Sequence, residues 1–279
     1  MKSQNFVLKA LLLVLVGISF VACAPGGSSS GAGGSGYGVL SSTEQATLAD
    51  GIFRAVDGAP AHSYVSGLQL ISTPAAAAAN AKLTATQAID LKTAINANCT
   101  KTMTPSSVSS FPAHIEGSLV GANCPISMTF VADVEGSSGV SLKVISSVEM
   151  RLVAEPWASA TEISLVNINS VGSYQVVGNA AYANTDSKVI YKLKEGTQLS
   201  LHFYGTSIQP DKSISGNYTK TVNYDFSYKG ISARITLVTT GEVGKAAAQK
   251  VYLNGEEITD ANREKFKDLI DAFCKLIMA

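Results

Sequence analysis

A two-residue alternation of apolar and polar side chains runs through the middle of the chain, from about residue 113 to residue 254. It is sharpest over residues 218–228, where one set of alternate positions is largely aromatic or apolar and the other holds Thr, Asn, Asp and Ser. Lys229-Gly230 interrupts the run, and the alternation resumes over residues 231–237. Because successive side chains of a β-strand point to opposite faces, this pattern predicts an antiparallel hairpin with one face in a core.

Shorter runs of the same kind extend the predicted sheet. They occupy residues 126–130, 140–144, 189–193 and 199–203, and Gly and Asn punctuate them, as at Asn254-Gly255. No helical pattern between them is long enough for the crossover that a pair of parallel strands needs. The sequence therefore predicts nine or ten antiparallel strands.

Helical spacing appears on both sides of this region. Ser41 with Glu44, or Ser42 with Gln45, can form a capping box at the start of a first helix, which Gly58 can end. A second helix is predicted after Thr84, and a third runs to the end of the chain from Thr259 or Asp260. The apolar positions that define the three helical faces are Leu48, Ile52 and Val56; Ala88, Leu91 and Ile95; and Phe266, Leu269, Ile270, Phe273 and Ile277.

These elements predict an α+β fold in which a large curved antiparallel sheet packs against N-terminal helices and a C-terminal helix. A sheet of this size must curl or split, so a half-barrel and a sandwich both remain open. One globular domain is expected over residues 42–279. The aromatic stripe Tyr218, Tyr224, Phe226 and Tyr228 either belongs to its core or lines a hydrophobic cavity.

The first 22 residues have the composition of an export signal. Lys2 and Lys9 precede or border an apolar stretch over residues 10–20, and Ala22 supplies a small residue for cleavage. The stretch is shorter than the roughly 20 apolar residues that span a bilayer. Cys23 follows Phe20-Val21-Ala22 directly.

This arrangement resembles the lipobox of bacterial lipoprotein precursors. The resemblance implies a cut before Cys23, acyl chains such as palmitate on that cysteine, and attachment to a membrane of the cell envelope. Ala24, rather than Asp, in the next position implies the outer membrane. The alternative is an ordinary secretory signal with a cysteine near its cleavage point. The half-barrel plan is also similar, in strand and helix order only, to carriers and receptors that handle lipoproteins at the outer membrane.

A flexible tether is expected over residues 23–41, because residues 24–38 are nearly all Gly, Ser and Ala. Within it, residues 27–31 fit the G-x-S-x-G pattern of serine hydrolases and residues 31–36 fit the G-x-G-x-x-G pattern of dinucleotide sites. Both motifs need a preceding strand and a following helix, which this segment lacks.

Three cysteines follow Cys23, and an exported protein tends to pair them. Cys99 and Cys124 lie at element ends in polar surroundings, so a Cys99–Cys124 disulfide is predicted. Cys274 lies on the apolar face of the last helix and is predicted to be a buried free thiol. A metal site is the alternative, but it needs more His and Cys at short spacing than the sequence offers.

Charge and motifs restrict the function further. The chain has 21 basic and 21 acidic residues without a basic run, so nucleic acid is not an expected partner. His62, His114 and His202 are scattered, and Asp133 with Glu135 lacks the spacing of a calcium loop. No cofactor and no catalytic residue is predicted.

Three functions remain. The first is a non-enzymatic envelope lipoprotein that binds or scaffolds another envelope component, protein or lipid. The second is a lipid or lipoprotein carrier with a hydrophobic cavity. The third is a hydrolase of an envelope polymer, which would need a cleft with two facing carboxylates.

Overall fold

The computed structural model describes residues 37–57, 93–94, 97–105, 110, 112–137, 141–153, 155, 158, 162–177, 180–210, 217–242 and 248–278. Cys23 and most of the predicted helix after Thr84 lie outside these residues. The described elements, in chain order, are α2 (Ser42–Asp57), β1 (Thr100–Thr104), β2 (Ala113–Val120), β3 (Ile126–Ser137), β4 (Ser141–Leu152), β5 (Ile163–Val177), β6 (Ala180–Leu193), β7 (Gln198–Pro210), β8 (Asn217–Tyr228), β9 (Ile231–Glu242), β10 (Ala248–Leu253), β11 (Glu256–Glu257), the 3-10 helix η2 (Arg263–Phe266) and α6 (Lys267–Met278).

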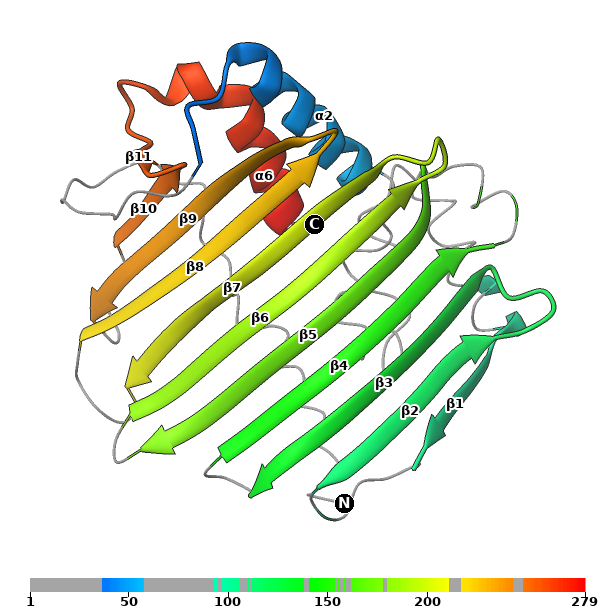
Figure 1. Ribbon diagram of the computed structural model, residues 1–279. Helices are drawn as coiled ribbons and strands as arrows, with labels where there is room; N and C mark the ends of the chain where they lie inside the picture. Colours follow the sequence, from blue (N-terminus) through cyan, green and yellow to red (C-terminus); the bar gives the residue numbers. More distant parts are fainter. Residues whose placement is uncertain are drawn as a thin grey trace.

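All eleven strands belong to one open sheet, in which each strand pairs antiparallel with the next along the chain (Figure 1). The predicted α+β class with a large antiparallel sheet is confirmed, and a single sheet in this order is not a sandwich. Nine of the strands lie between residues 113 and 254, as the alternation predicts. The prediction missed β1 and β11, which are only five and two residues long and carry too little pattern to recognise.

Two tight turns set the register at one end of the sheet. Lys229 and Gly230 have φ angles of 49° and 79°, and Asn254 and Gly255 have φ angles of 51° and 89°. Two-residue hairpin loops favour left-handed backbone at both positions, because this geometry matches the twist of the flanking strands. The turn at Lys229-Gly230 therefore pairs Tyr228 with Ile231 and fixes every pair farther along β8 and β9.

Helices α2 and α6 lie side by side across one end of the inner, apolar face, over strands β7 to β9 (Figure 1). The ring of Phe273 on α6 meets Tyr224 at 4.9 Å and Phe226 at 5.8 Å, edge to face in both cases. Gly51 on α2 lies directly over the ring of Tyr228, where an added Cβ would be only 2.5 Å from a ring carbon. Close packing of both helices on the aromatic stripe of β8 therefore depends on a glycine in one and a phenylalanine in the other.

Polar contacts hold both ends of α2. Ser41 and Glu44 form the predicted capping box, in which the Ser41 amide donates to the Glu44 carboxylate at 2.8 Å. At the other end, Arg54 donates to both carboxylate oxygens of Glu195, at 2.7 and 2.8 Å, and also to Glu162 and the Tyr228 hydroxyl. These hydrogen bonds, with a further one from Thr197, lower the pKa of Glu195 to about 2. Arg54 thus ties the helix to the β6–β7 turn.

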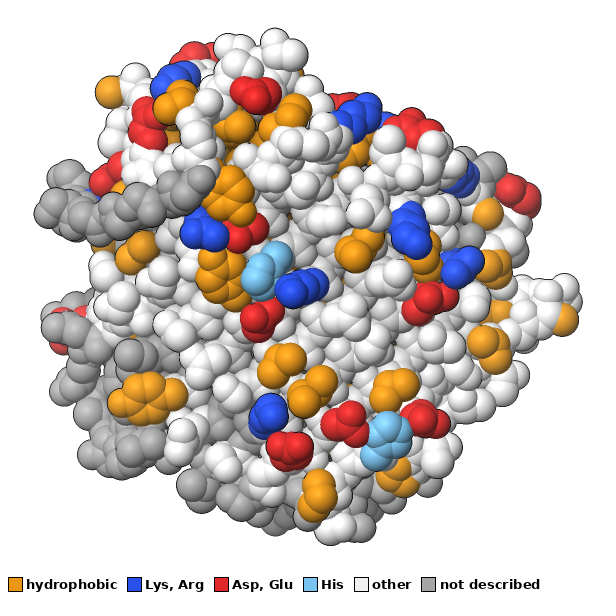
Figure 2. Space-filling view, in the orientation of Figure 1, with side chains coloured by type: hydrophobic (Ala, Val, Ile, Leu, Met, Phe, Trp, Pro, Cys, Tyr) orange, Lys and Arg blue, Asp and Glu red, His pale blue; other side chains and the backbone are white. Residues whose placement is uncertain are grey.

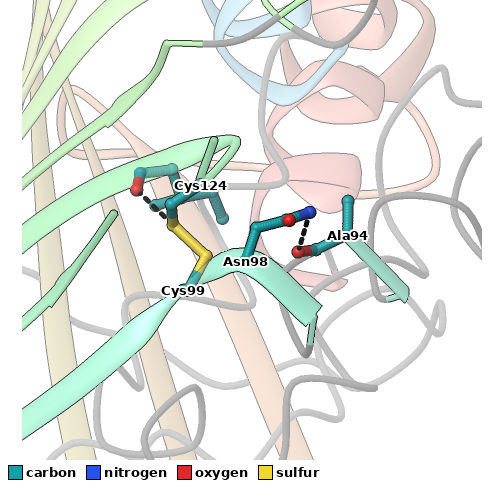
Figure 3. The surroundings of a disulfide bond; sticks show 5 residues. Ala94, Asn98, Cys99 and Cys124 are labelled. Carbon is teal, nitrogen blue, oxygen red and sulfur yellow. Dashed lines mark hydrogen bonds between the residues drawn. A yellow bond between two sulfur atoms is a disulfide. The ribbon is translucent and has the colours of Figure 1, made fainter. Parts of the chain in front are cut away.

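A disulfide joins Cys99, just before β1, to Cys124, just before β3 (Figure 3). The predicted pairing is confirmed, with the two Cα atoms 4.7 Å apart. Closing a loop of 25 residues stabilises a fold by about 3 kcal/mol in the chain-entropy model. Its position explains how a strand as short as β1 is kept at the edge of the sheet.

The prediction that Cys274 is a free thiol is wrong. Cys274 is buried in α6 as expected, but it is disulfide-bonded, as are the other two cysteines among the described residues. An apolar environment makes a cysteine easy to bury, and it does not by itself prevent the sulfur from being oxidised.

Replacing Phe273 with Ala should lower the free energy of unfolding by about 3–5 kcal/mol, the usual cost of removing a phenyl ring from a core. For a domain of this size, the melting temperature should then fall by on the order of 10 °C. Thermal unfolding followed by circular dichroism measures the shift.

Lys267→Ala is the matched control, because Lys267 lies on the same helix with its side chain 56% exposed beside Glu264. An exposed ion pair of this kind contributes little, so this variant should melt close to the wild type. Equal melting temperatures for the two variants would show that Phe273 does not complete the core.

Candidate binding surface

The residues of the aromatic stripe of β8 differ in how deeply they are buried. Tyr224, Phe226 and Tyr228 are at most 3% exposed and contact the two helices, whereas Tyr218 lies half-buried near the far end of the strand with its hydroxyl beside Gly241. Three of the four predicted cavity residues therefore lie together on the inner face. Their role as the lining of a ligand cavity stays a prediction.

The inner face contains few polar groups among the described residues. Ser170 and Ser187 form a buried cross-strand hydrogen bond of 2.5 Å, and burial lowers the pKa of Lys220 on β8. The Tyr224 hydroxyl is fully buried and has no hydrogen-bond partner within the described part of the chain. Burial also raises the pKa of this phenol, so it stays protonated and neutral.

The outer face of the sheet carries the charged and polar side chains that the inner face lacks. Figure 2 shows it as a broad surface on which charged and hydrophobic side chains are dispersed among other side chains and backbone. Its most structured part is a stack over β7 to β9. Arg234 lies between two tyrosines, with its guanidinium carbon 5.2 Å from the ring of Tyr37 and 5.7 Å from that of Tyr204.

Asp225 completes this stack from the neighbouring strand. Arg234 donates to both of its carboxylate oxygens, at 2.6 and 2.8 Å, which holds the guanidinium flat between the rings. Burial, followed by the charge on Asp225, raises the pKa of both Tyr37 and Tyr204. His202 stacks on Tyr204 with the ring centroids 4.7 Å apart, and it contacts Asp186 at 2.9 Å.

The stack also holds the root of the predicted tether. Asn254, in the β10–β11 turn, donates from its side-chain amide to the Gly38 carbonyl at 2.7 Å. The same side chain accepts a hydrogen bond from the Arg234 backbone amide at 2.8 Å. Tyr37 and Gly38 are thus fixed on the outer face before the chain enters α2.

A second polar group lies at the opposite side of the sheet. His114 on β2 contacts Asp133 through Nδ1 at 2.6 Å and Glu116 through Nε2 at 3.0 Å. Asp133 therefore already contacts the His114 imidazole, and Glu135 lies 3.7 Å from Lys143. Within the described ranges, no three His, Cys, Asp or Glu residues are placed to hold a metal ion.

Aliphatic side chains lie between these two polar groups. Val131, Ile145 and Val171, on β3, β4 and β5, are 37%, 39% and 41% exposed. The register places Ile145 directly opposite Val171. On the other side, Ile145 stands opposite Asp133, and Val131 lies two residues from Asp133 along β3. The outer face thus has a small group of partly exposed aliphatic residues among polar and charged ones.

Sequence reasoning missed most of this surface, although one signal was available. Once Lys229-Gly230 is a two-residue turn, Asp225 and Arg234 must stand opposite each other. The contact of Tyr37 with Arg234 has no such signal, because the two residues are far apart in sequence and no local pattern relates them.

Comparison with known proteins gives no relative: no family model, no curated protein and no solved structure matches this chain. Among the described helices, none has the length and apolar character needed to cross a membrane.

The pKa of His114 should exceed that of an ordinary histidine, because Asp133 and then Glu116 accept hydrogen bonds from its charged form. Its raised pKa means that this group's contribution to stability is complete below the unfolded pKa of about 6.5 and is lost as the pH rises through the folded pKa. An NMR titration of the imidazole protons measures the folded value.

Asp133→Asn should lower the His114 pKa more than Glu116→Gln, because the hydrogen bond to Asp133 has the larger effect. A wild-type His114 that titrates at the ordinary value, or that does not respond to Asp133→Asn, would show that this contact does not persist in solution.

Proposed function

We propose that the protein is a lipid-anchored lipoprotein of the bacterial cell envelope with a non-enzymatic binding or scaffolding role. The observation that carries this proposal is Cys23, which stands between an export signal and a Gly/Ser-rich tether. Two or more acyl chains on one cysteine hold a protein stably at a membrane, whereas a single chain does so only marginally. By the resemblance to lipoprotein precursors, the membrane is the outer membrane.

The attachment of Tyr37 and Gly38 to the outer face supports this proposal. Thirteen residues, 24–36, separate Cys23 from that fixed point. A Gly/Ser chain of this length has a root-mean-square span of about 20 Å. The domain is therefore held within roughly its own radius of the membrane while it stays free to turn.

A binding role fits the outer face better than catalysis does. A hydrolase of an envelope polymer would place two carboxylates across a cleft. On this face, Asp133 and Asp186 contact histidines, and Asp225 pairs with Arg234 in a bidentate ion pair. Paired in this way, the carboxylates orient side chains on an exposed sheet and support a contact surface.

The carrier function has one specific observation in its favour, the unpartnered hydroxyl of Tyr224 in the apolar interior. A buried hydroxyl without a hydrogen bond costs about 1–3 kcal/mol, so such a group is either a tolerated defect or a contact for a polar ligand head.

Tyr224→Phe separates these two explanations. If the protein is not a carrier, removing the unpaired hydroxyl should leave the melting temperature unchanged or raise it, without any effect on a fluorescent fatty acid added to the purified protein. Tyr228→Phe is the matched control, since its hydroxyl accepts a hydrogen bond from Arg54 at 3.0 Å and its loss should destabilise the fold by about 1 kcal/mol. Probe binding by the wild type that Tyr224→Phe weakens would favour the carrier.

Cys23→Ser should abolish acylation and move the protein from the membrane fraction to the soluble fraction. Mass spectrometry of the mature N-terminal peptide should find residue 23 first and carrying the mass of its acyl chains. Ser29→Ala, in the tether, is the control and should leave both results unchanged.

Two outcomes would contradict the anchor. One is an unmodified N-terminus, at residue 23 or elsewhere. The other is a disulfide at Cys23, because a sulfur in a thioether to diacylglycerol cannot also form a disulfide. Cys274 is disulfide-bonded, and with Cys99 paired to Cys124 the sequence leaves Cys23 as its one possible partner within the chain. The anchor and that disulfide are therefore alternatives, and non-reducing peptide mapping of the mature protein decides between them.

A further inference from the structure

Charges on the outer face follow a regular arrangement across strands β2, β4 and β6. Arg151 on β4, which pairs with Glu149 at 3.1 Å, and Lys192 on β6 lie on this face toward the strand ends. Nearer the middle, each of the three strands carries a basic and an acidic side chain: His114 and Glu116 on β2, Lys143 and Glu149 on β4, and Asp186 and Lys188 on β6. We call these six residues the charged strip. All of them are exposed.

The strand register places the basic and acidic residues of β2, β4 and β6 on either side of one row of residues. Ile115, Ala132, Ser146, Ser170 and Ser187 stand opposite one another in turn, so they form a straight row across β2 to β6. The charged residues lie symmetrically about this row. On β2 and β6 the two charges are one residue to either side of it, and on β4 they are three residues to either side.

This symmetry has a consequence for contact with an identical molecule. A two-fold axis along the row, in the plane of the contact, places each strand over the same strand of a second copy and reverses its direction. Lys143 then faces Glu149 of the second copy, His114 faces Glu116, and Asp186 faces Lys188. Every such pair occurs twice, so the strip offers six pairs of opposite charge.

We propose that this face is a homodimer interface, in which the charged strip binds the same strip of a second copy through this two-fold axis. An isologous contact requires a surface that is complementary to itself, and opposite charges at equal distances from an axis satisfy that requirement.

The other outer-face side chains near the row meet no like charge across the same axis. Asp133 faces Val131 of the second copy rather than another carboxylate, and Glu135 faces Thr129. The exposed aliphatic residues Ile145 and Val171, which also lie one residue from the row, face Ser147 and Asn169. The middle of the contact therefore combines aliphatic and polar side chains, and the charged pairs of β2 and β6 lie on either side of it.

The area is also sufficient. Five strands spaced by about 4.8 Å, over about eight residues of about 3.3 Å each, cover a plan area of roughly 600 Å² per copy. A standard interface buries about 800 Å² of accessible surface per partner, and side chains that interdigitate bury more than the plan area.

The geometry agrees with attachment to one membrane, a point that rests on the proposed function. Because the axis runs along the row, it leaves β9 of both copies on the same side of the dimer. The tether root at Tyr37 lies against Arg234 of β9, outside the strip. Both tethers therefore leave toward one side, and confinement to a common membrane raises the effective concentration of the two copies.

Charge reversal at Lys143 and Glu149 tests the dimer. Lys143→Glu places two carboxylates at each contact, and Glu149→Lys places two amines there. Either variant of the full-length protein, extracted in mild detergent, should associate at least about tenfold more weakly than the wild type in sedimentation velocity. An equimolar mixture of the two variants should regain the wild-type affinity, because each then faces the opposite charge.

Three controls make the result decisive. Lys267→Glu, a charge reversal on α6, should leave association unchanged, and circular dichroism should show that every variant is folded. Chance occupation of one detergent micelle by two molecules does not depend on these charges, so it cannot reproduce recovery on mixing. The same difference in association should be measured on protein that is not acylated. The result of this test therefore does not depend on the lipid anchor. A monomeric wild type, or a dimer insensitive to both reversals, would overturn the proposal.

Discussion

The need to keep one face of an eleven-stranded sheet out of water determines most of this structure. Most of the inward-facing residues of the long strands are apolar, and burial of apolar surface contributes about 25 cal/mol per Å². The sheet is one-sided, so it cannot be stable alone. Helices α2 and α6 supply part of the cover, and the fit of Phe273 and Gly51 against Tyr224, Phe226 and Tyr228 is where that cover is closest.

The same one-sidedness leaves the outer face available for function. Its side chains need not fill a core, so their charges can be arranged for orientation and contact. One example is the orientation of Tyr37. Its ring contacts Arg234, which is held by an ion pair with Asp225 and by the ring of Tyr204. In the proposed dimer, Lys143 and Glu149 illustrate contact: they lie on the same strand, too far apart to pair with each other, and equally distant from the central row.

The fixed tether root connects this surface to the proposed location at the membrane. A Gly/Ser segment has no means of orienting a domain by itself, because it buries almost nothing. Orientation can come only from where the segment is attached. Attachment beside β9, rather than beside β2, leaves the centre of the outer face uncovered by the tether root and open to a partner.

Local pattern was enough to predict the sheet, the two turns, the helices α2 and α6 and the disulfide between Cys99 and Cys124. Each depends on interactions between residues close in sequence or on a periodicity of one segment. The strands β1 and β11 were missed because neither is long enough to have a period. The export signal and Cys23 are likewise local, and they lead to the proposed location without any structure.

Only the tertiary structure decided how distant residues meet. No periodicity relates Arg54 to Glu195 or Tyr37 to Arg234, because those contacts depend on where α2 and the chain before it cross the sheet. The prediction that Cys274 is a free thiol was wrong for the same reason, because the oxidation of a thiol depends on its neighbours in space. The relation of Lys143 and Glu149 to a common row appears only when four strand pairings, from β2 to β6, are aligned. A sequence determines which face of each strand is polar, but the register between strands decides what pattern those polar residues form.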